Sequence, residues 1–427
     1  MGHDEEVDVP AQRHVTLPLT AAQRRVRLAG ATGGDFSTGK VARCVEMRGP
    51  TDRVHFETAL REVVARTEAL HVRVVDGVDG PVQFVGPRTP VAPSSVDLGE
   101  EDDPVRAADD WLADAATLPL PPGRTFHHVV LQVVPGLSYW YAEYHPIALD
   151  AFGAALVERH VVDAYRTLGR HDCRQPTGTG ALRELVALDV AYRASAQRDR
   201  DRAYWRSLLD GPPARPARNV GTPGRHRITL PPHVAIGSHR LAHRLGVPLR
   251  RLLVAVSAVA ARAVTGERDV LLGLPVTCRA EAASRLLAGP MGNVVPLRLR
   301  VDRGVEETCA AVTAALADGL PHQRYCGEDA VREAGLPGPV GTAVAPVVDV
   351  VRDGPGHRLG GRRWRSRPLR GGLTGDVHLT FTDRAGPRLD LDVTAADTGD
   401  ADAYLDRLRQ VLDDVTTGGR AATRQAG

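Results

Sequence analysis

The segment 137–165 constrains the fold of this 427-residue chain most strongly, because it predicts a strand, a tight turn and a helix in immediate succession. An apolar run that begins at Leu137 indicates the strand, and the turn ends at Asp150. After Asp150, apolar side chains recur every three or four residues, which is the spacing of one helix face. A turn at the end of a buried strand can hold a polar side chain rigidly toward a cavity. We therefore expect functional residues at this turn.

Length and composition exclude several classes of protein. A chain of 427 residues exceeds one ordinary domain, so we expect two lobes. It is 43% hydrophobic and 25% charged, which is typical of a globular protein, and its net charge of +2 gives no argument for nucleic-acid binding. No run of about 18 apolar residues predicts a membrane span, and the acidic N-terminus lacks the apolar core of a secretory signal. The five cysteines never form a Cys-x-x-Cys pair, which indicates reduced thiols, no metal site and a cytoplasmic protein.

Alternating and helical patterns together predict an α/β protein of two similar halves. Residues 1–17 form a polar tail, 18–175 form an N-terminal lobe and 181–427 form a C-terminal lobe, with a linker at 170–180 and a crossover segment near 285–298. We expect strands at 41–47, 72–75, 125–134, 270–275, 345–351 and 376–394, and helices from Thr20, from Asp52, and at 104–116, 181–209, 247–265 and 400–415. Residues 86–103 are expected to be loop. The pair His127-His128 lies in a β-pattern and is interpreted as a half-exposed strand alternation, not a site.

The turn itself resembles a known signature. His145-Pro-Ile-Ala-Leu-Asp-Ala151 is similar to the His-His-x-x-x-Asp-Gly motif of the condensation domains of nonribosomal peptide synthetases. Their superfamily includes chloramphenicol acetyltransferase. Pro146 stands where the family has its second His, and Ala151 where it has Gly. Further motifs of the family are matched in the same order, at 18–25, 66–73, 204–208, 289–298 and 322–328.

The resemblance implies a fold and a way of working. It implies two chloramphenicol acetyltransferase-like lobes in a V-shaped pseudo-dimer with a central tunnel. Donor and acceptor would be presented on the phosphopantetheine of carrier proteins, with no cofactor bound by the chain itself. Asp150 would be structural and pair with Arg279. The residues expected to line the tunnel are Tyr144, Gly289, Met291, Gly292 and Asn293.

Pro146 governs what chemistry the motif can carry out. In the family the second His is the presumed base or positioning group, whereas proline has neither a side-chain acceptor nor a backbone N–H. His145 is the remaining imidazole of the motif. Because adjacent side chains on an extended segment point in opposite directions, we favour a structural role for His145 over a catalytic one. An alternative alignment places His145 at the second His, with a bulge before Asp150.

Three functions follow from these observations. The first is an acyltransferase that forms an amide or ester from a tethered thioester and relies on positioning instead of a base. The second is a recruitment module like the X domain of glycopeptide pathways, which also lacks the second His. The third is an unusual reaction such as a cyclisation of a tethered substrate. No carrier attachment signature and no nucleotide-binding loop stands out, so we expect a free-standing monomer that meets carrier proteins in trans. The intact motifs at 289–298 and 322–328 favour the acyltransferase.

Overall fold

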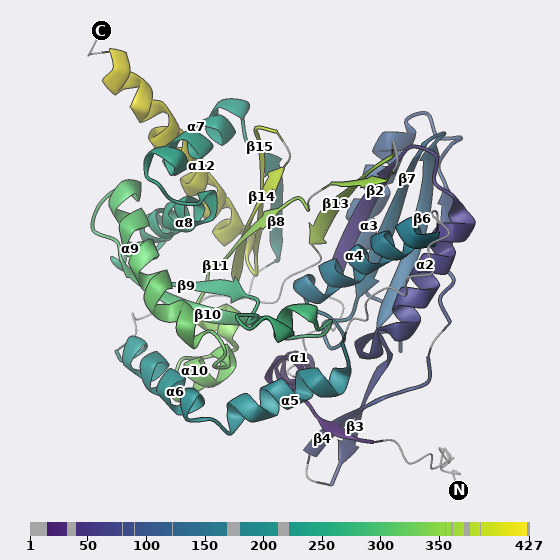
Figure 1. Cartoon of the computed structure of the whole chain (residues 1–427). Coiled ribbons are helices and arrows are strands. Elements are labelled where there is room, and N and C mark those ends of the chain that lie inside the picture. Colours follow the sequence, from purple (N-terminus) through teal and green to yellow (C-terminus); the bar gives the residue numbers. More distant parts are fainter. Residues whose placement is uncertain are drawn as a thin grey trace, which may run out of the picture.

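The computed structural model describes residues 15–31, 40–78, 80–88, 90–121, 123–168, 180–211, 222–354, 356–359, 362–370, 376–384 and 386–424. The chain forms two α/β lobes, each built on a six-stranded sheet, which open from one another like a V (Figure 1). A three-stranded sheet of β1 (Leu17–Pro18), β4 (Gly80–Val85) and β3 (Val72–Gly77) lies below the first lobe. The expected linker at 170–180 falls almost wholly outside the described residues.

The first lobe carries the motif turn. Its sheet has the order β12 (His357–Leu359), β13 (Arg362–Arg370), β2 (Val41–Arg48), β7 (Leu137–Tyr144), β6 (Phe126–Val134) and β5 (Ser94–Asp97). Helices α2 (Arg53–Arg66) and α4 (Ala151–Leu168) cover one face, and their apolar side chains share a core with alternate residues of β7. Helix α3 (Pro104–Thr117) covers the other face. Every residue of β7 is therefore buried.

The second lobe has a mixed sheet. Its order is β10 (Asn293–Arg300), β9 (Asp269–Val276), β11 (Val347–Arg352), β14 (Val377–Arg384), β15 (Arg388–Ala395) and β8 (Gly224–Thr229). The helices packed against this core include α7 (Pro232–Arg244), α8 (Leu249–Thr265), α9 (Val305–Gly319) and α12 (Thr398–Arg424). Short elements follow α9, namely the turn η4 (Leu320–His322) and the helices α10 (Gly327–Glu333) and α11 (Val340–Ala343).

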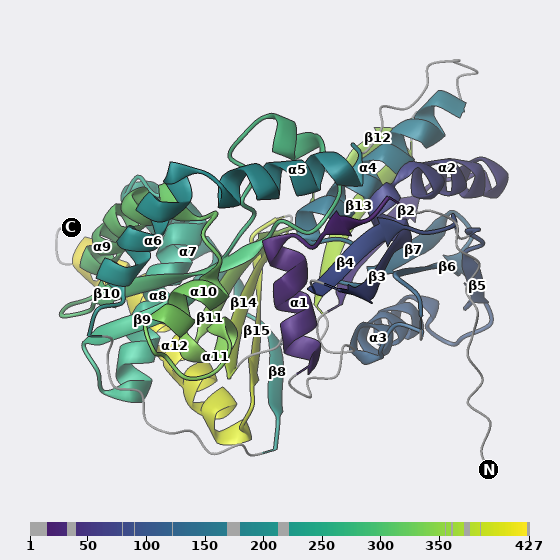
Figure 2. The same cartoon turned by 90° about the horizontal axis from the view of Figure 1, so that it is seen from below.

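Three further helices of the described part of the chain lie where the lobes meet or along their base (Figure 1). Helix α1 (Ala21–Ala31) lies between the lobes, and α5 (Leu182–Arg193) and α6 (Ala196–Leu208) run from one lobe toward the other along the base of the V (Figures 1 and 2). Thr20 begins α1 as expected. Its hydroxyl accepts from the Gln23 amide at 3.2 Å, and the Gln23 side chain accepts from the Thr20 amide at 2.9 Å, which is a reciprocal capping box.

The strand order corrects the expected division of the chain. Residues 181–427 were expected to form the second lobe by themselves, yet β12 and β13 belong to the sheet of the first lobe. Strand β13 pairs antiparallel with β2 from Arg363↔Arg48 to Arg370↔Val41, and Trp364 lies fully buried in the first core. The segment expected to cross over, 285–298, places Leu287 and Ala288 in the core of the first lobe and then continues into β10, which pairs with β9 in the second sheet. Residues 94–97, expected to be loop, form the edge strand β5.

Candidate functional site

The motif turn is held by backbone hydrogen bonds at its start and by a carboxylate at its end. The His145 amide donates to Thr125 O at 2.8 Å, which extends the pairing of β6 and β7 by one step. At the other end, Asp150 Oδ1 accepts from the Gly153 amide at 2.7 Å and so caps helix α4. Ala151, at the family's Gly position, is exposed at the first residue of α4, so its methyl group meets no steric obstacle.

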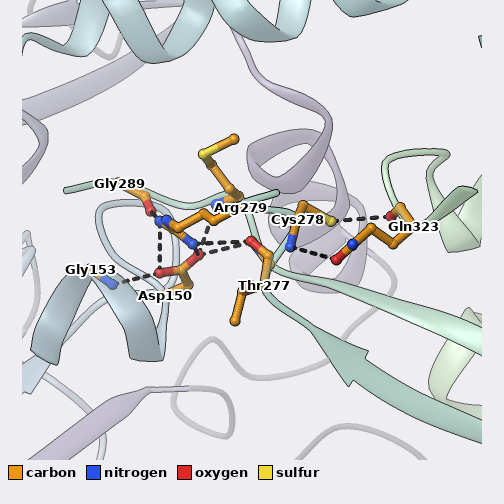
Figure 3. A network of polar contacts seen from close by, with 9 residues as sticks. Asp150, Gly153, Thr277, Cys278, Arg279, Gly289 and Gln323 are labelled. Carbon is orange, nitrogen blue, oxygen red and sulfur yellow. Dashed lines mark hydrogen bonds and ion pairs between the residues drawn. The ribbon is translucent and has the colours of Figure 1, made fainter. Parts of the chain in front are cut away.

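Asp150 is the centre of a network that joins the two lobes (Figure 3). Arg279 binds it with both terminal nitrogens, at 2.7 Å to Oδ2 and 3.1 Å to Oδ1, which is the pairing expected from the sequence. Oδ2 also accepts from the amides of Met291 and Gly292, each at 2.9 Å. Arg279 donates in turn to Gly289 O at 2.7 Å. The side chains of Arg279 and Asp150 are only 1% and 17% exposed, so water screens this pair weakly.

A strained residue directs Arg279 toward Asp150. Cys278 has a φ of 55°, in the left-handed region that non-glycine residues rarely adopt. Two hydrogen bonds to Gln323 hold this conformation (Figure 3). The Gln323 side-chain oxygen accepts from the Cys278 amide at 3.2 Å, and the Gln323 backbone oxygen accepts from the Cys278 thiol at 3.1 Å. Burial raises the pKa of the Cys278 thiol to about 12, so the thiol is protonated at neutral pH.

His145 is engaged within its own turn. Its Nδ1 accepts from the Ile147 amide at 3.0 Å, and because an amide can only donate, Nδ1 carries no proton. Burial lowers the pKa of His145, so the ring is neutral near pH 7 and its proton lies on Nε2. Neither ring nitrogen then offers a lone pair to a substrate. In the pair of strands β6 and β7, both fully described, the register is irregular only between Gln132 and Val134, so no bulge lies near the end of β7.

Tyr144 does not lie where the sequence analysis placed it. Its side chain is 1% exposed and packs in the first core, with its ring 5.6 Å from that of His128. The alternation of β7 explains this, since Trp140, Ala142 and Tyr144 all point to the face covered by α2 and α4. Tyr144 is therefore absent from the lining of the cavity described below.

The histidine pair of β6 is only partly the half-exposed alternation that we expected. His128 is 2% exposed and accepts from Trp140 Nε1 at 3.3 Å. Burial lowers the pKa of His128 to about 3, so this ring is neutral. The side chain of His127 is 30% exposed, and its Nδ1 lies 3.1 Å from Glu143 Oε1. Glu143 is buried and also binds Lys40, the only lysine of the chain, and the Tyr141 hydroxyl.

A cavity lies beside the Asp150 network, where α1 and α5 meet the loops at 290–293 and 324–326. Of the residues expected to line a tunnel, Met291, Gly292 and Asn293 line this cavity, whereas Gly289 does not. Asn293 is fixed by hydrogen bonds from its amide nitrogen to Gln323 O at 3.0 Å and Tyr325 O at 2.6 Å. The whole lining consists of Thr20, Ala21, Ala22, Arg25, Leu185, Asp189, Tyr192, Cys278, Pro290, Met291, Gly292, Asn293, Arg324 and Cys326.

The remaining motifs build structure around the cavity. His322 stacks on Tyr204 at 4.2 Å between ring centroids, and its Nδ1 lies 2.7 Å from Asp201. Trp205 donates from its indole to His322 O at 3.0 Å. These contacts anchor the loop that carries Gln323 and Arg324. Arg25 also lines the cavity and lies within the matched motif at 18–25, but nothing in the sequence marked it as a site residue.

Comparison with solved structures defines the class of fold. The first condensation domain of the calcium-dependent antibiotic synthetase, in complex with a substrate analogue, is 28% identical with a TM-score of 0.81, covering 94% of this chain and 96% of that chain. The starter condensation domain of rhizomide synthetase, in complex with C8-CoA, is 28% identical with a TM-score of 0.80, covering 94% and 95%. The chain is thus a two-lobed protein with the chloramphenicol acetyltransferase-like fold.

The family follows from the sequence comparison. The model of the Condensation domain family matches residues 13–348, and the chain belongs to that family. Curated relatives are a dimodular nonribosomal peptide synthase of Bacillus subtilis, 28% identical over 96% of this chain, and an isonitrile lipopeptide synthase of Streptomyces coeruleorubidus, 31% identical over 90%. The chain spans only 18% and 27% of the length of these two relatives. Among the described residues, no helix is long and apolar enough to cross a membrane.

Proposed function

We propose that this chain is an acyltransferase that joins an acyl or aminoacyl thioester, carried on the phosphopantetheine of a carrier protein, to an amine or hydroxyl. The Asp150 network supports this proposal most directly. It fixes the motif turn and the cavity-lining residues 290–292 as one unit across the lobes, with an almost fully buried Arg279. A rigid cavity at this place can hold two reactants beside one another.

Positioning supplies the rate in this proposal. The nucleophile attacks the thioester carbonyl, the carbon–sulfur bond breaks, and the phosphopantetheine thiol leaves. An amine enters in its neutral form, so its proton passes to solvent or to the departing thiolate. Loss of a general base typically costs a factor of about 10² to 10⁴, whereas holding two reactants in place contributes up to about 10⁵ to 10⁸ M in effective concentration. Because the Ile147 amide occupies Nδ1 of the neutral His145 ring, His145 does not replace the base.

Incubation with acyl-loaded carrier proteins and candidate acceptors, followed by mass spectrometry, tests the proposal. Product is expected with the wild type, and His145→Ala is expected to lower the rate only modestly. Gly292→Trp should abolish turnover by filling the cavity. Gly292→Ala is the matched control, since a Cβ at Gly292 would lie 3.5 Å from Asp150 Oδ2 and 3.6 Å from Val276 O, at ordinary contact distance. A fully active Gly292→Trp, or complete loss of activity in a folded His145→Ala, would reject this mechanism.

A recruitment module is the second candidate, and the state of His145 favours it. In this motif the second position is proline, the one imidazole is engaged by Ile147 and the Asp150 carboxylate is bound by Arg279, so none of the three accepts a proton from the nucleophile. Such a module would bind a carrier protein or a tailoring enzyme without forming product from any loaded carrier pair. Its affinity for the partner would be unchanged in Gly292→Trp, because the partner binds outside the cavity. Product formation by the wild type would eliminate this candidate.

A further inference from the structure

The cavity contains a cation that forms no ion pair with the described residues. Arg25 reaches it from α1, and its one side-chain hydrogen bond to the described part of the chain is a long one, from Nη1 to Asn293 Oδ1 at 3.4 Å. Asn293 is a neutral amide whose nitrogen already donates to two carbonyl oxygens. Its side chain therefore cannot rotate to bring Oδ1 closer to Arg25 without breaking these hydrogen bonds. Among the residues that the structure describes, no carboxylate lies within ion-pair distance of Arg25.

The other charges of the cavity are already paired. Asp189 accepts from the Ala21 amide at 3.1 Å and lies 2.8 Å from Arg193. Arg324 binds Glu281 at 2.8 Å and stacks over the ring of Tyr192. The charge available to a ligand is therefore that of Arg25.

The surroundings of Arg25 strengthen any interaction with an anion. Apolar and thiol side chains, namely Leu185, Met291, Cys278 and Cys326, form much of the wall, and the pKa values of both thiols are raised by burial. These groups contribute no negative charge at neutral pH. A guanidinium that is partly withdrawn from water and has unused donors gains most from a carboxylate, which can accept two of its N–H groups at once.

We propose that Arg25 makes this cavity a carboxylate subsite, so that the substrate held there carries a free carboxylate. This rests on the proposed function in one respect, namely that the cavity receives a reactant. Two sources share this chemistry. One is the α-carboxylate of a free amino acid, which an acceptor bound to a carrier as a thioester would lack. The other is a carboxylate at the end of a tethered acyl chain.

Two binding arms distinguish the sources, each measured by calorimetric titration of the full chain. The first compares leucine with leucinamide, which lacks the free carboxylate. The second compares the N-acetylcysteamine thioester of glutarate with the thioester of the corresponding terminal amide. In at least one arm the carboxylate ligand should bind about ten- to a hundredfold more tightly, the range of a hydrogen-bonded charge pair.

Variants connect the preference to Arg25. Arg25→Gln should abolish it, and Arg25→Lys should keep part of it. Neither change should disturb the fold, because Arg25 makes one long hydrogen bond; a melting curve checks this. Arg27→Gln is the matched control on the same helix, since Arg27 pairs with Asp76 outside the cavity and its loss should leave the preference intact.

The outcomes separate this inference from the proposed function. Equal binding of both ligands in both arms, or a preference that survives in Arg25→Gln, would overturn the carboxylate subsite. If neutral substrates are then converted to product, the acyltransferase proposal stands without it. A carboxylate preference that depends on Arg25 supports the subsite even when no product forms. The absence of product would then count against the acyltransferase proposal and not against the subsite.

Discussion

Asp150 is the residue on which the geometry of the motif depends. Asp150→Ala would remove the acceptor of Arg279, of two backbone amides and of the cap of α4. Because Arg279 is 1% exposed, it would become a buried and unpaired cation, at a cost of about 3–5 kcal/mol. Urea unfolding should show this loss. Asp150→Asn, which keeps an acceptor but not the charge, should lose less unfolding free energy. If Asp150→Ala unfolded at the same urea concentration as the wild type, the role of the pair would be contradicted.

His128 gives the folded state a defined sensitivity to acid. Burial lowers its pKa from 6.5 to about 3, so between these values the unfolded chain binds a proton that the folded protein does not. Stability should therefore fall as the pH drops from about 6.5 toward 3. His128→Phe should flatten part of this fall, while the exposed His243→Phe should not. Burial also lowers the pKa values of His71, His145 and His160, so some dependence will remain. Unfolding free energies at pH 7.5 and 5 test this, and parallel profiles for wild type and His128→Phe would contradict it.

At the scale of elements, helix α1 depends on its capping box to place Arg25 in the cavity. Thr20→Ala removes the acceptor for the Gln23 amide and should destabilise the protein by about 1 kcal/mol. Thr20→Ser keeps the hydroxyl and serves as the control. Chemical denaturation measures both. Equal stability of Thr20→Ala and Thr20→Ser would show that the cap does not matter here.

Elements with a clear period were predictable from the sequence, and those without were not. Strand β2, strand β7 and helix α4 carry apolar patterns, and the structure contains them within a few residues of the expected ranges. Strand β13 has the sequence Arg-Arg-Trp-Arg-Ser-Arg-Pro-Leu-Arg. Its many charged residues give no apolar pattern that would predict a strand, and the pairing with β2 is visible only in the structure. The Asp150–Arg279 pair was also predictable, because both residues match motifs of the family that occur in the same order along this chain. The cavity could not be predicted, because α1, α5 and the loops at 290–293 and 324–326 meet only in the folded chain.

At the scale of the whole molecule, strands β12 and β13 from the second half of the chain complete the sheet of the first lobe. Strand β13 pairs with β2 along eight residues, from Val41 to Arg48, and Trp364 is fully buried among the side chains of the first core. The Tyr165 ring lies tilted against Trp364, at 4.9 Å between ring centroids, and Phe56 contacts Trp364 edge-on. Loss of so large a buried side chain costs about 3–5 kcal/mol. The first lobe therefore lacks both a sheet edge and a core residue unless the second half of the chain is present.

A fragment of residues 1–175 tests this dependence. It would expose the edge of β2, with unpaired backbone groups, and the vacated site of Trp364, which together favour aggregation. We expect the fragment to be insoluble or unfolded alone, and to recover native circular dichroism when it is produced together with residues 176–427. Trp364→Ala in the second fragment should weaken that recovery, whereas substitution of the exposed Arg363 by alanine should not. A monomeric fragment 1–175 that unfolds cooperatively by itself would show that the lobes are independent, since its core would then be complete without β13.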